Sequence, residues 1–420
     1  MGLPVVWKKY GSYHWFSLAL IASFPLLVPF GRLSEIPIIL MAIGGVFLLI
    51  NERKKLFLNR EIILFTFVFS AIWIPVWISL IGAVYPPKTL SVGLTFVRMF
   101  LAGVFIVSTM AGSPGVSGKV LKTLALLLCV WVADALLQAA VGYNLIAYPD
   151  VGGRVNSFFG ESLNFGPYMA TFSPLLFVYA LLNWRWQGQS FAFLGVVVVV
   201  FMAGSRSGWV VLAFVIAGIA VWIVRREGWK ILSRFAIMAL VLMGVAGGIL
   251  QFSQPFSDRL RQSMLVFSKD SESVNHALSN RLPIWETTFE VIRANPINGV
   301  GARGLRYAYE DFASPDDYFV QKDYTVHHAH NLVLDIGSET GLIGLTGLVL
   351  AMGILLCAWR AAGPEERLRA FPYALVLFVI FLPINSHFAM YSSAWSTTYF
   401  WAMSLFFGAL AKQEGFKKAA

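Results

Sequence analysis

The sequence predicts an all-α polytopic membrane protein with about twelve transmembrane helices, a helical cap between the ninth and the tenth, and both termini in the cytoplasm. Hydrophobic residues make up 58% of the 420-residue chain and charged residues only 13%. A soluble domain carries roughly 25% charged residues, so this chain lacks the polar side chains needed to cover a water-exposed surface. Long apolar runs separated by clusters of Lys and Arg complete the pattern of a membrane protein.

Each span is placed in an apolar run between charged residues, because a hydrocarbon core of about 30 Å requires about 20 helical residues. The predicted spans are residues 14–30, 35–50, 62–83, 90–110, 120–142, 164–182, 191–204, 208–224, 235–252, 341–359, 370–390 and 394–411. A single span across Arg206 would leave a charge near its centre, so two spans with a tight turn are predicted there. The chain then divides into residues 1–252 with nine spans, 253–340 as the cap, and 341–420 with three spans.

The distribution of cations predicts the orientation. Nineteen Lys and Arg residues fall on the side of the termini, whereas the short loops of the opposite side hold four, namely Arg32, Lys88, Arg154 and Arg206. The positive-inside rule therefore places the termini in the cytoplasm. The net charge of +10 reflects this topology, so we expect no nucleic-acid partner.

Residues 253–340 are the only long polar segment, and they hold four of the six histidines. Polar, aromatic and helix-forming residues alternate along residues 281–292, which predicts a small helical cap on the outer face of the membrane. Long segments inside a compact fold are usually functional, so we look for the site here.

Three histidines, His327, His328 and His330, lie close together before the tenth predicted span. We predict that His330 is a general base, because an imidazole can accept a proton near neutral pH. A metal site on His327 and His330 would need further ligands at a suitable spacing, and no such pattern is present, so we expect no metal or other cofactor. The alternative for His327 and His328 is a polar pair at the membrane interface.

Arg154, Arg206 and Arg281 are predicted to lie on the outer face and to bind phosphate groups, since a guanidinium group matches phosphate oxygens in a bidentate manner. Arg206 also begins a predicted helix, where free backbone N–H groups favour an anion. The alternatives are lipid head-group contact for Arg206 and a surface ion pair for Arg281. Surface ion pairs are expected for Arg303 and Arg306.

Arg98 lies inside the fourth predicted span, where an unpaired charge is costly. Asp134 lies at a matching depth in the fifth span, about eight residues below the outer end of its helix. We therefore predict an intramembrane ion pair between Arg98 and Asp134.

Three motifs occur in a characteristic order: Gly204-Ser205-Arg206-Ser207-Gly208-Trp209, then Arg281 with Trp285, then His330-Asn331 leading into Glu339-Thr340-Gly341-Leu342-Ile343-Gly344. In this order and with this topology, the chain resembles bacterial O-antigen ligases and O-antigen polymerases, which are glycosyltransferases with lipid-linked donors. The resemblance covers most of the chain, and its motifs lie between about residues 150 and 345.

The resemblance implies a periplasmic cap and an active site on the periplasmic face of the bacterial inner membrane. It implies transfer of a glycan from undecaprenyl diphosphate to an acceptor hydroxyl without a metal, with inversion, among membrane lipids. By matching motif, His330 would be the catalytic base, while Arg206 and Arg281 would hold the diphosphate. Arg154 lies in a more variable stretch, next to Glu161, which departs from the family pattern.

The same motifs imply supporting roles for Asn331, Trp285 and His327. In the ligase branch the acceptor is the lipid A core oligosaccharide, and in the polymerase branch it is another lipid-linked repeat unit. We favour the ligase branch because the chain is compact, has a single cap, and resembles the ligase pattern around His330. A flippase or transporter for lipid-linked sugars is an alternative of a different class, but its ionisable residues should gather near the midplane of the membrane. A non-catalytic receptor or assembly protein is a further alternative.

Overall fold

A computed structural model describes residues 13–112, 115–228, 254–268 and 270–412, together with residues 244 and 248. The chain in these ranges is helical and holds no β-strand, with an isolated β-bridge between Tyr143 and Pro149. The longer helices are α2 (Tyr13–Leu27), α3 (Glu35–Leu56), α4 (Arg60–Ile78), α5 (Pro86–Ala111), α6 (Val116–Val141), α7 (Phe165–Asn183), α8 (Trp186–Met202), α9 (Arg206–Glu227), α16 (Leu332–Ala361), α17 (Pro364–Ile380) and α18 (Ser393–Leu410). The cap helices are α11 (Gln254–Met264), α12 (Ser271–Ala277), α13 (Leu282–Ala294), α14 (Leu305–Phe312) and α15 (Tyr318–Gln321).

The predicted spans overlap the longer helices, except that the ninth, residues 235–252, lies outside the described residues apart from 244 and 248. Within the described part, seven helical stretches are long and apolar enough to cross a membrane. The stretch from Trp15 to Leu56 counts as one of them although it contains both α2 and α3, and the apolar helix α8 is shorter. An all-helical, multi-pass membrane protein is therefore confirmed. The count of twelve and the orientation stay predictions.

Two predicted boundaries are wrong, and both errors concern the site. Helix α16 begins at Leu332, nine residues before the predicted start of the tenth span, and its backbone breaks at Gly341. Helix α17 ends at Ile380, and residues 381–392 form an irregular loop where a helix was predicted up to residue 390. Pro383 explains the second difference, because proline removes a helix hydrogen bond and disfavours the helical conformation of the residue before it.

Helices α7 and α18 lie at the centre of the molecule. Both are buried on all sides, as expected for helices that are apolar around their whole circumference. Trp401 of α18 packs against Phe24 and Phe172, with ring centroids 5.4 Å and 5.8 Å away. Other helices surround this pair, and small residues allow them to approach closely. A side chain at Gly45 of α3, for example, would collide with the backbone carbonyl of Leu101 in α5.

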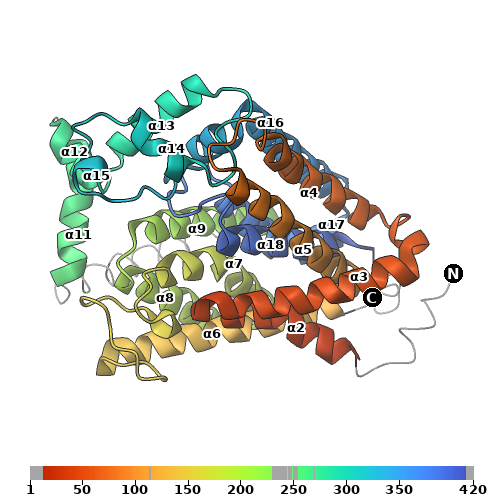
Figure 1. Cartoon of the computed structure of the whole chain (residues 1–420). Helices are drawn as coiled ribbons and strands as arrows, with labels where there is room; N and C mark the ends of the chain where they lie inside the picture. Colours follow the sequence, from red (N-terminus) through yellow and green to blue (C-terminus); the bar gives the residue numbers. More distant parts are fainter. Residues whose placement is uncertain are drawn as a thin grey trace.

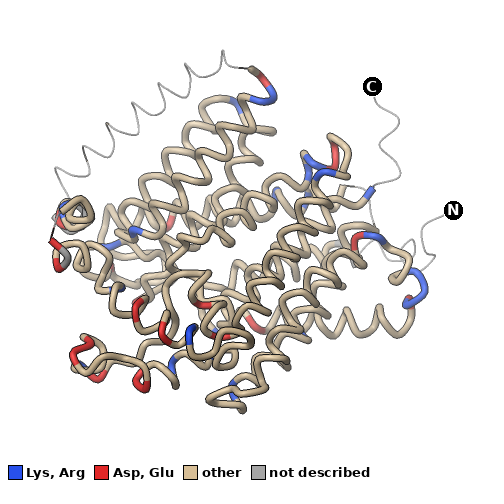
Figure 2. Tube along the Cα trace, turned by 90° about the horizontal axis from the view of Figure 1, so that it is seen from above, with Lys and Arg blue, Asp and Glu red and all other residues tan. Residues whose placement is uncertain are grey.

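The cap helices lie together at one end of the molecule (Figure 1). Figure 2 shows many of the described Lys and Arg at helix ends away from the cap, whereas most of the described Asp and Glu lie in and around the cap. The charge difference read from the sequence thus corresponds to two opposite ends of the fold.

The cap has its own small apolar core, which includes Ile284, Val291 and Tyr309. It is fixed to the break in α16 by backbone hydrogen bonds. The N–H groups of Leu342 and Ile343, which follow the break, donate to the carbonyls of Pro296 (2.8 Å) and Ile297 (3.1 Å). Gly341 has a φ of 62°, a conformation that glycine adopts at little cost. The break therefore holds the cap at a fixed position above the helices.

Candidate functional site

His330 lies in the short segment between the cap and α16, and its backbone is left-handed, with a φ of 52°. Its ring atom Nδ1 lies 2.9 Å from the carbonyl oxygen of Ser386, in the loop before α18. Since a carbonyl oxygen only accepts, Nδ1 carries the hydrogen and donates it. The Nε2 atom of the neutral ring then keeps a lone pair that can accept a proton.

Two further histidines surround His330. The ring of His328 lies 3.9 Å from that of His330, and its Nδ1 accepts the backbone N–H of His330 at 3.2 Å. His387 belongs to the same loop as Ser386, and its Nε2 lies 2.7 Å from Oδ1 of Asn164. His387 was not among the predicted site residues, because it lay within the predicted eleventh span. Pro383, three residues after the end of α17, was the available signal that this residue belongs to a loop.

Burial keeps these imidazoles neutral. It lowers the pKa of His330 to about 4, with a further contribution from the positive charge of Arg281, while the bond to Ser386 acts in the opposite direction. The pKa of His387 is also lowered to about 4, mainly by burial. A ring with such a pKa is uncharged at neutral pH, which is the form that a general base requires.

Arg281 lies near His330, and Arg206 lies near Arg281. Arg206 is the first residue of α9, after Ser205, whose side chain caps the helix. Its guanidinium group donates to the carbonyl of Ala277 and to the hydroxyl of Ser279, in the turn between α12 and α13. Arg281 follows in that turn, directly before α13. The turn therefore brings the two arginines together although 75 positions separate them in the sequence.

Among the described residues, the two arginines lack a negative partner. Neither forms an ion pair with any acid that the structure describes. Burial, followed by the charge of Arg206, lowers the pKa of Arg281 to about 10. Two neighbouring guanidinium groups without a counter-ion form a site suited to a phosphate or diphosphate group.

The supporting residues Trp285 and Asn331 hold the backbone around His330. The indole N–H of Trp285 donates to the carbonyl of Ala329 at 3.0 Å. Asn331 caps α16, because its side chain accepts the N–H groups of Val333 (3.0 Å) and Leu334 (3.2 Å). The side chain of His327, by contrast, is exposed.

Asp335 is a buried residue that connects the two segments of the site. One carboxylate oxygen accepts the N–H of Ala329 at 3.3 Å, and the other accepts the N–H of Met390 at 2.8 Å. The segment before α16 and the loop before α18 are therefore joined through one side chain. The part of the chain described by the structure contains no group of three or more His, Cys, Asp or Glu arranged for a metal ion.

Arg154 lies in the loop before α7, which meets the end of α8 through a bond from the Val155 N–H to the carbonyl of Met202 (3.2 Å). No described contact joins its guanidinium group to Arg206 or Arg281, so its role stays a prediction. The surface ion pairs expected for Arg303 and Arg306 are absent among the described side chains. Instead, the backbone N–H of Arg303 donates to Oε2 of Glu339 at 2.6 Å.

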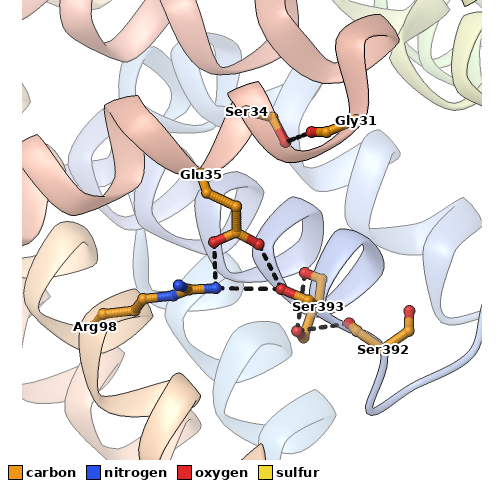
Figure 3. A network of polar contacts seen from close by, with 7 residues as sticks. Gly31, Ser34, Glu35, Arg98, Ser392 and Ser393 are labelled. Carbon is orange, nitrogen blue, oxygen red and sulfur yellow. Dashed lines mark hydrogen bonds and ion pairs between the residues drawn. The ribbon is translucent and has the colours of Figure 1, made fainter.

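The predicted ion pair between Arg98 and Asp134 is wrong. Arg98 pairs with Glu35 at the start of α3, and both contact the hydroxyl of Ser393 (Figure 3). Asp134 instead accepts the N–H of Leu145 (2.8 Å) and the hydroxyl of Ser157 (2.5 Å). The reason is that α3 and α5 pack side by side, so the nearest acid comes from an earlier helix.

Residues 191–349 match the family model described as O-antigen ligase. The matched segment begins inside α8 and ends inside α16, and it contains Arg206, Arg281 and His330. Arg154 and His387 lie outside it. The comparison with curated proteins gives no match.

Proposed function

We propose that this chain transfers a glycan from undecaprenyl diphosphate to a hydroxyl group of the lipid A core oligosaccharide. The match of residues 191–349 to the O-antigen ligase family model supports this proposal. The observation that carries this proposal is the position of a neutral, half-buried His330 near Arg281, which neighbours Arg206, with neither arginine paired to an acid in the described ranges. A general base and an anion site are the two requirements for displacing a diphosphate with a sugar hydroxyl.

Arg206 and Arg281 bind the diphosphate of the donor in this proposal. A guanidinium group has five N–H donors, so Arg206 keeps three after its contacts with Ala277 and Ser279. The first turn of α9 adds free backbone N–H groups close by. The prenyl chain stays in the bilayer, while the sugars lie below the cap.

His330 removes the proton from the acceptor hydroxyl. The hydroxyl oxygen forms a bond to the anomeric carbon of the donor while its proton passes to Nε2 of His330. The bond between the anomeric carbon and the diphosphate oxygen breaks, and the electron pair leaves with undecaprenyl diphosphate. Attack from the face opposite the leaving group inverts the anomeric carbon. The arginines neutralise the charge that develops on the diphosphate, so the reaction requires no metal.

The positive-inside rule places the cap and this site on the periplasmic face of the inner membrane. Donor and acceptor lipids then reach the site from the outer leaflet of that membrane. The high proportion of ionisable residues at the cap end, rather than at the midplane, favours an enzyme over a transporter.

The test is transfer by the purified protein in liposomes that contain the lipid-linked glycan and lipid A core. We expect glycan on lipid A core, and a fall of roughly 100- to 10,000-fold for His330→Ala, with unchanged folding and donor binding. Longer undecaprenyl-linked chains would identify a polymerase instead. Normal transfer by His330→Ala would contradict the role of the base, and movement of the donor across the bilayer without a covalent product would identify a flippase.

A further inference from the structure

A polar pocket lies between α5, the loop before α14 and the start of α18. It has a volume of about 140 Å³, and Lys88, Thr95, Arg303, Tyr391, Ser392 and Ser393 are among its lining residues. Ligand pockets usually measure about 300–1,000 Å³. This pocket is therefore suited to one substituent or one sugar unit, and not to a whole oligosaccharide.

The pocket has the chemistry of an anion site. Its lining includes two cations and several hydroxyl groups but no acid. Neither Lys88 nor Arg303 forms an ion pair with an acid in the described ranges. The first turn of α18 adds backbone N–H groups that have no partner within the helix. A doubly charged phosphate matches this set better than a singly charged carboxylate does.

Hydrogen bonds from α5 and the residues just before it to the cap join the two segments that carry Lys88 and Arg303. The N–H of Val84 donates to the carbonyl of Val300 at 3.0 Å, and the hydroxyl of Thr89 donates to the carbonyl of Ala302 at 3.3 Å. Arg303 itself has a left-handed backbone, with a φ of 65°. The buried carboxylate of Glu339 holds this conformation through the bond to the Arg303 N–H.

The wall formed by α18 is also fixed in place. Ser393 donates its hydroxyl to Glu35 at 2.6 Å and accepts from Arg98 at 3.2 Å, as Figure 3 shows. The ion pair between Glu35 and Arg98 leaves neither charge free. It joins α3, α5 and α18 around one of the serines that line the pocket.

The pocket adjoins the histidine cluster on the side of His328. The pKa of His328 is lowered to about 2, first by burial and then by the charges of His330 and Arg303. The loop before α18 also connects the two places, because Ser386 contacts His330 while Tyr391 lines the pocket. The charge of Arg281 acts on both His330 and His328, and that of Arg303 acts on His328, so both cation sites lie near the histidine pair.

We propose that this pocket binds a phosphate group on the sugar that accepts the glycan. The inference rests on the proposed function, because it requires a transfer reaction with an acceptor distinct from the donor. A phosphate held by Lys88 and Arg303 would fix the acceptor sugar with its hydroxyl next to His330, while Arg206 and Arg281 hold the donor diphosphate. Acceptor choice would then depend on the position of a phosphate relative to the reactive hydroxyl.

The experiment compares the wild-type protein with Lys88→Gln, Arg303→Gln and the control Arg293→Gln in lipid nanodiscs. Arg293 is an exposed cap arginine paired with Glu290, outside both sites. The acceptor is lipid A core with its core phosphates intact or removed. For the phosphorylated acceptor, each pocket variant should raise the acceptor KM roughly 10-fold or more. The donor KM and kcat should change less than twofold. With the dephosphorylated acceptor, the acceptor KM should be the same for the variants and the wild type.

An unchanged acceptor KM in both pocket variants would overturn the proposal, and so would a rise in the donor KM instead. A second arm measures calorimetric binding of the phosphorylated core oligosaccharide, released from lipid A, and of its dephosphorylated form. Binding should require the phosphate, weaken in both pocket variants and weaken at high salt. If wild-type protein transfers no glycan, the proposed function fails, whereas this binding measurement still decides the role of the pocket.

Discussion

A single hydrogen-bond acceptor, the carbonyl oxygen of Ser386, fixes the orientation of the His330 ring. Because Nδ1 donates to the Ser386 carbonyl, only Nε2 is free to take a proton. The sequence indicated His330 as a base from its type and its motif, but it could not indicate which nitrogen acts. That depends on a residue 56 positions away. The partner of Arg98 was missed for the same reason, since it depends on a contact between distant segments. His387 was missed because it lay within a predicted span.

The geometry of Arg206 predicts a cost for replacing its guanidinium group with an amine. Arg206→Lys keeps the charge but cannot contact Ala277, Ser279 and a diphosphate at the same time. We expect transfer to fall roughly 10- to 100-fold, mainly through a higher donor KM. Steady-state kinetics with varied donor would measure this, with Arg293→Lys as the control. Equal donor KM values for Arg206→Lys and wild type would contradict bidentate binding.

The pKa of His330 predicts an unusual dependence on pH. The reaction needs the neutral ring, and the lowered pKa of about 4 keeps the ring neutral in mild acid. The rate should therefore be level between about pH 8 and pH 5 and fall as the pH drops through about 4. The control is a wild-type profile of rate against pH measured with the donor already bound. It separates the titration of the base from any pH dependence of donor binding.

Arg281→Gln tests the cause of that shift. Removing a nearby cation makes protonation of His330 easier, so its pKa rises towards the ordinary value and the acidic limb of the profile moves to higher pH. Arg293→Gln, which removes an exposed cation, should leave the limb in place. An acidic limb near pH 6.5 in the wild type would show that burial does not lower this pKa.

At the scale of elements, the sequence predicted the membrane helices well because long apolar runs report burial directly. The prediction was wrong where the end or break of a helix depends on more than the composition of its own apolar run. The break in α16 depends on Gly341 and on carbonyls from the cap, and α17 ends ten residues before the end of its apolar run. The candidate site lies at these two irregular places, so its arginines and His330 could be named while their arrangement could not.

Asp335 should be essential for joining the two segments of the site. Asp335→Asn replaces one accepting oxygen with an NH₂ group, which would face the N–H of Ala329 or Met390. We expect a loss of roughly 1–3 kcal/mol in stability, because one buried N–H loses its partner. Thermal unfolding in detergent measures this, and hydrogen exchange should increase at Ala329 and Met390. The exposed Asp316→Asn is the control, and equal stability of both variants would refute this role for Asp335.

At the scale of the whole molecule, one end is basic and the other carries the cap and most of the acids. This difference predicts the orientation in the membrane, which can be measured by cysteine labelling. Cys129 and Cys357 are first replaced, and a single cysteine is then introduced as Lys322→Cys in the cap or Lys54→Cys at the end of α3. A membrane-impermeant maleimide should label the cap cysteine in cells with a permeable outer membrane. The α3 cysteine should react only after lysis, and the reverse result would invert the topology.

The carbonyl that orients His330 belongs to the main chain, and this has a consequence for genetic studies of the site. An alanine scan replaces side chains only, so a scan across residues 381–392 would leave the Ser386 anchor intact. A one-residue deletion in that loop would move the anchor and rotate the imidazole, with every reactive side chain still present. Loop length, more than loop composition, should therefore determine which changes in this segment the protein tolerates.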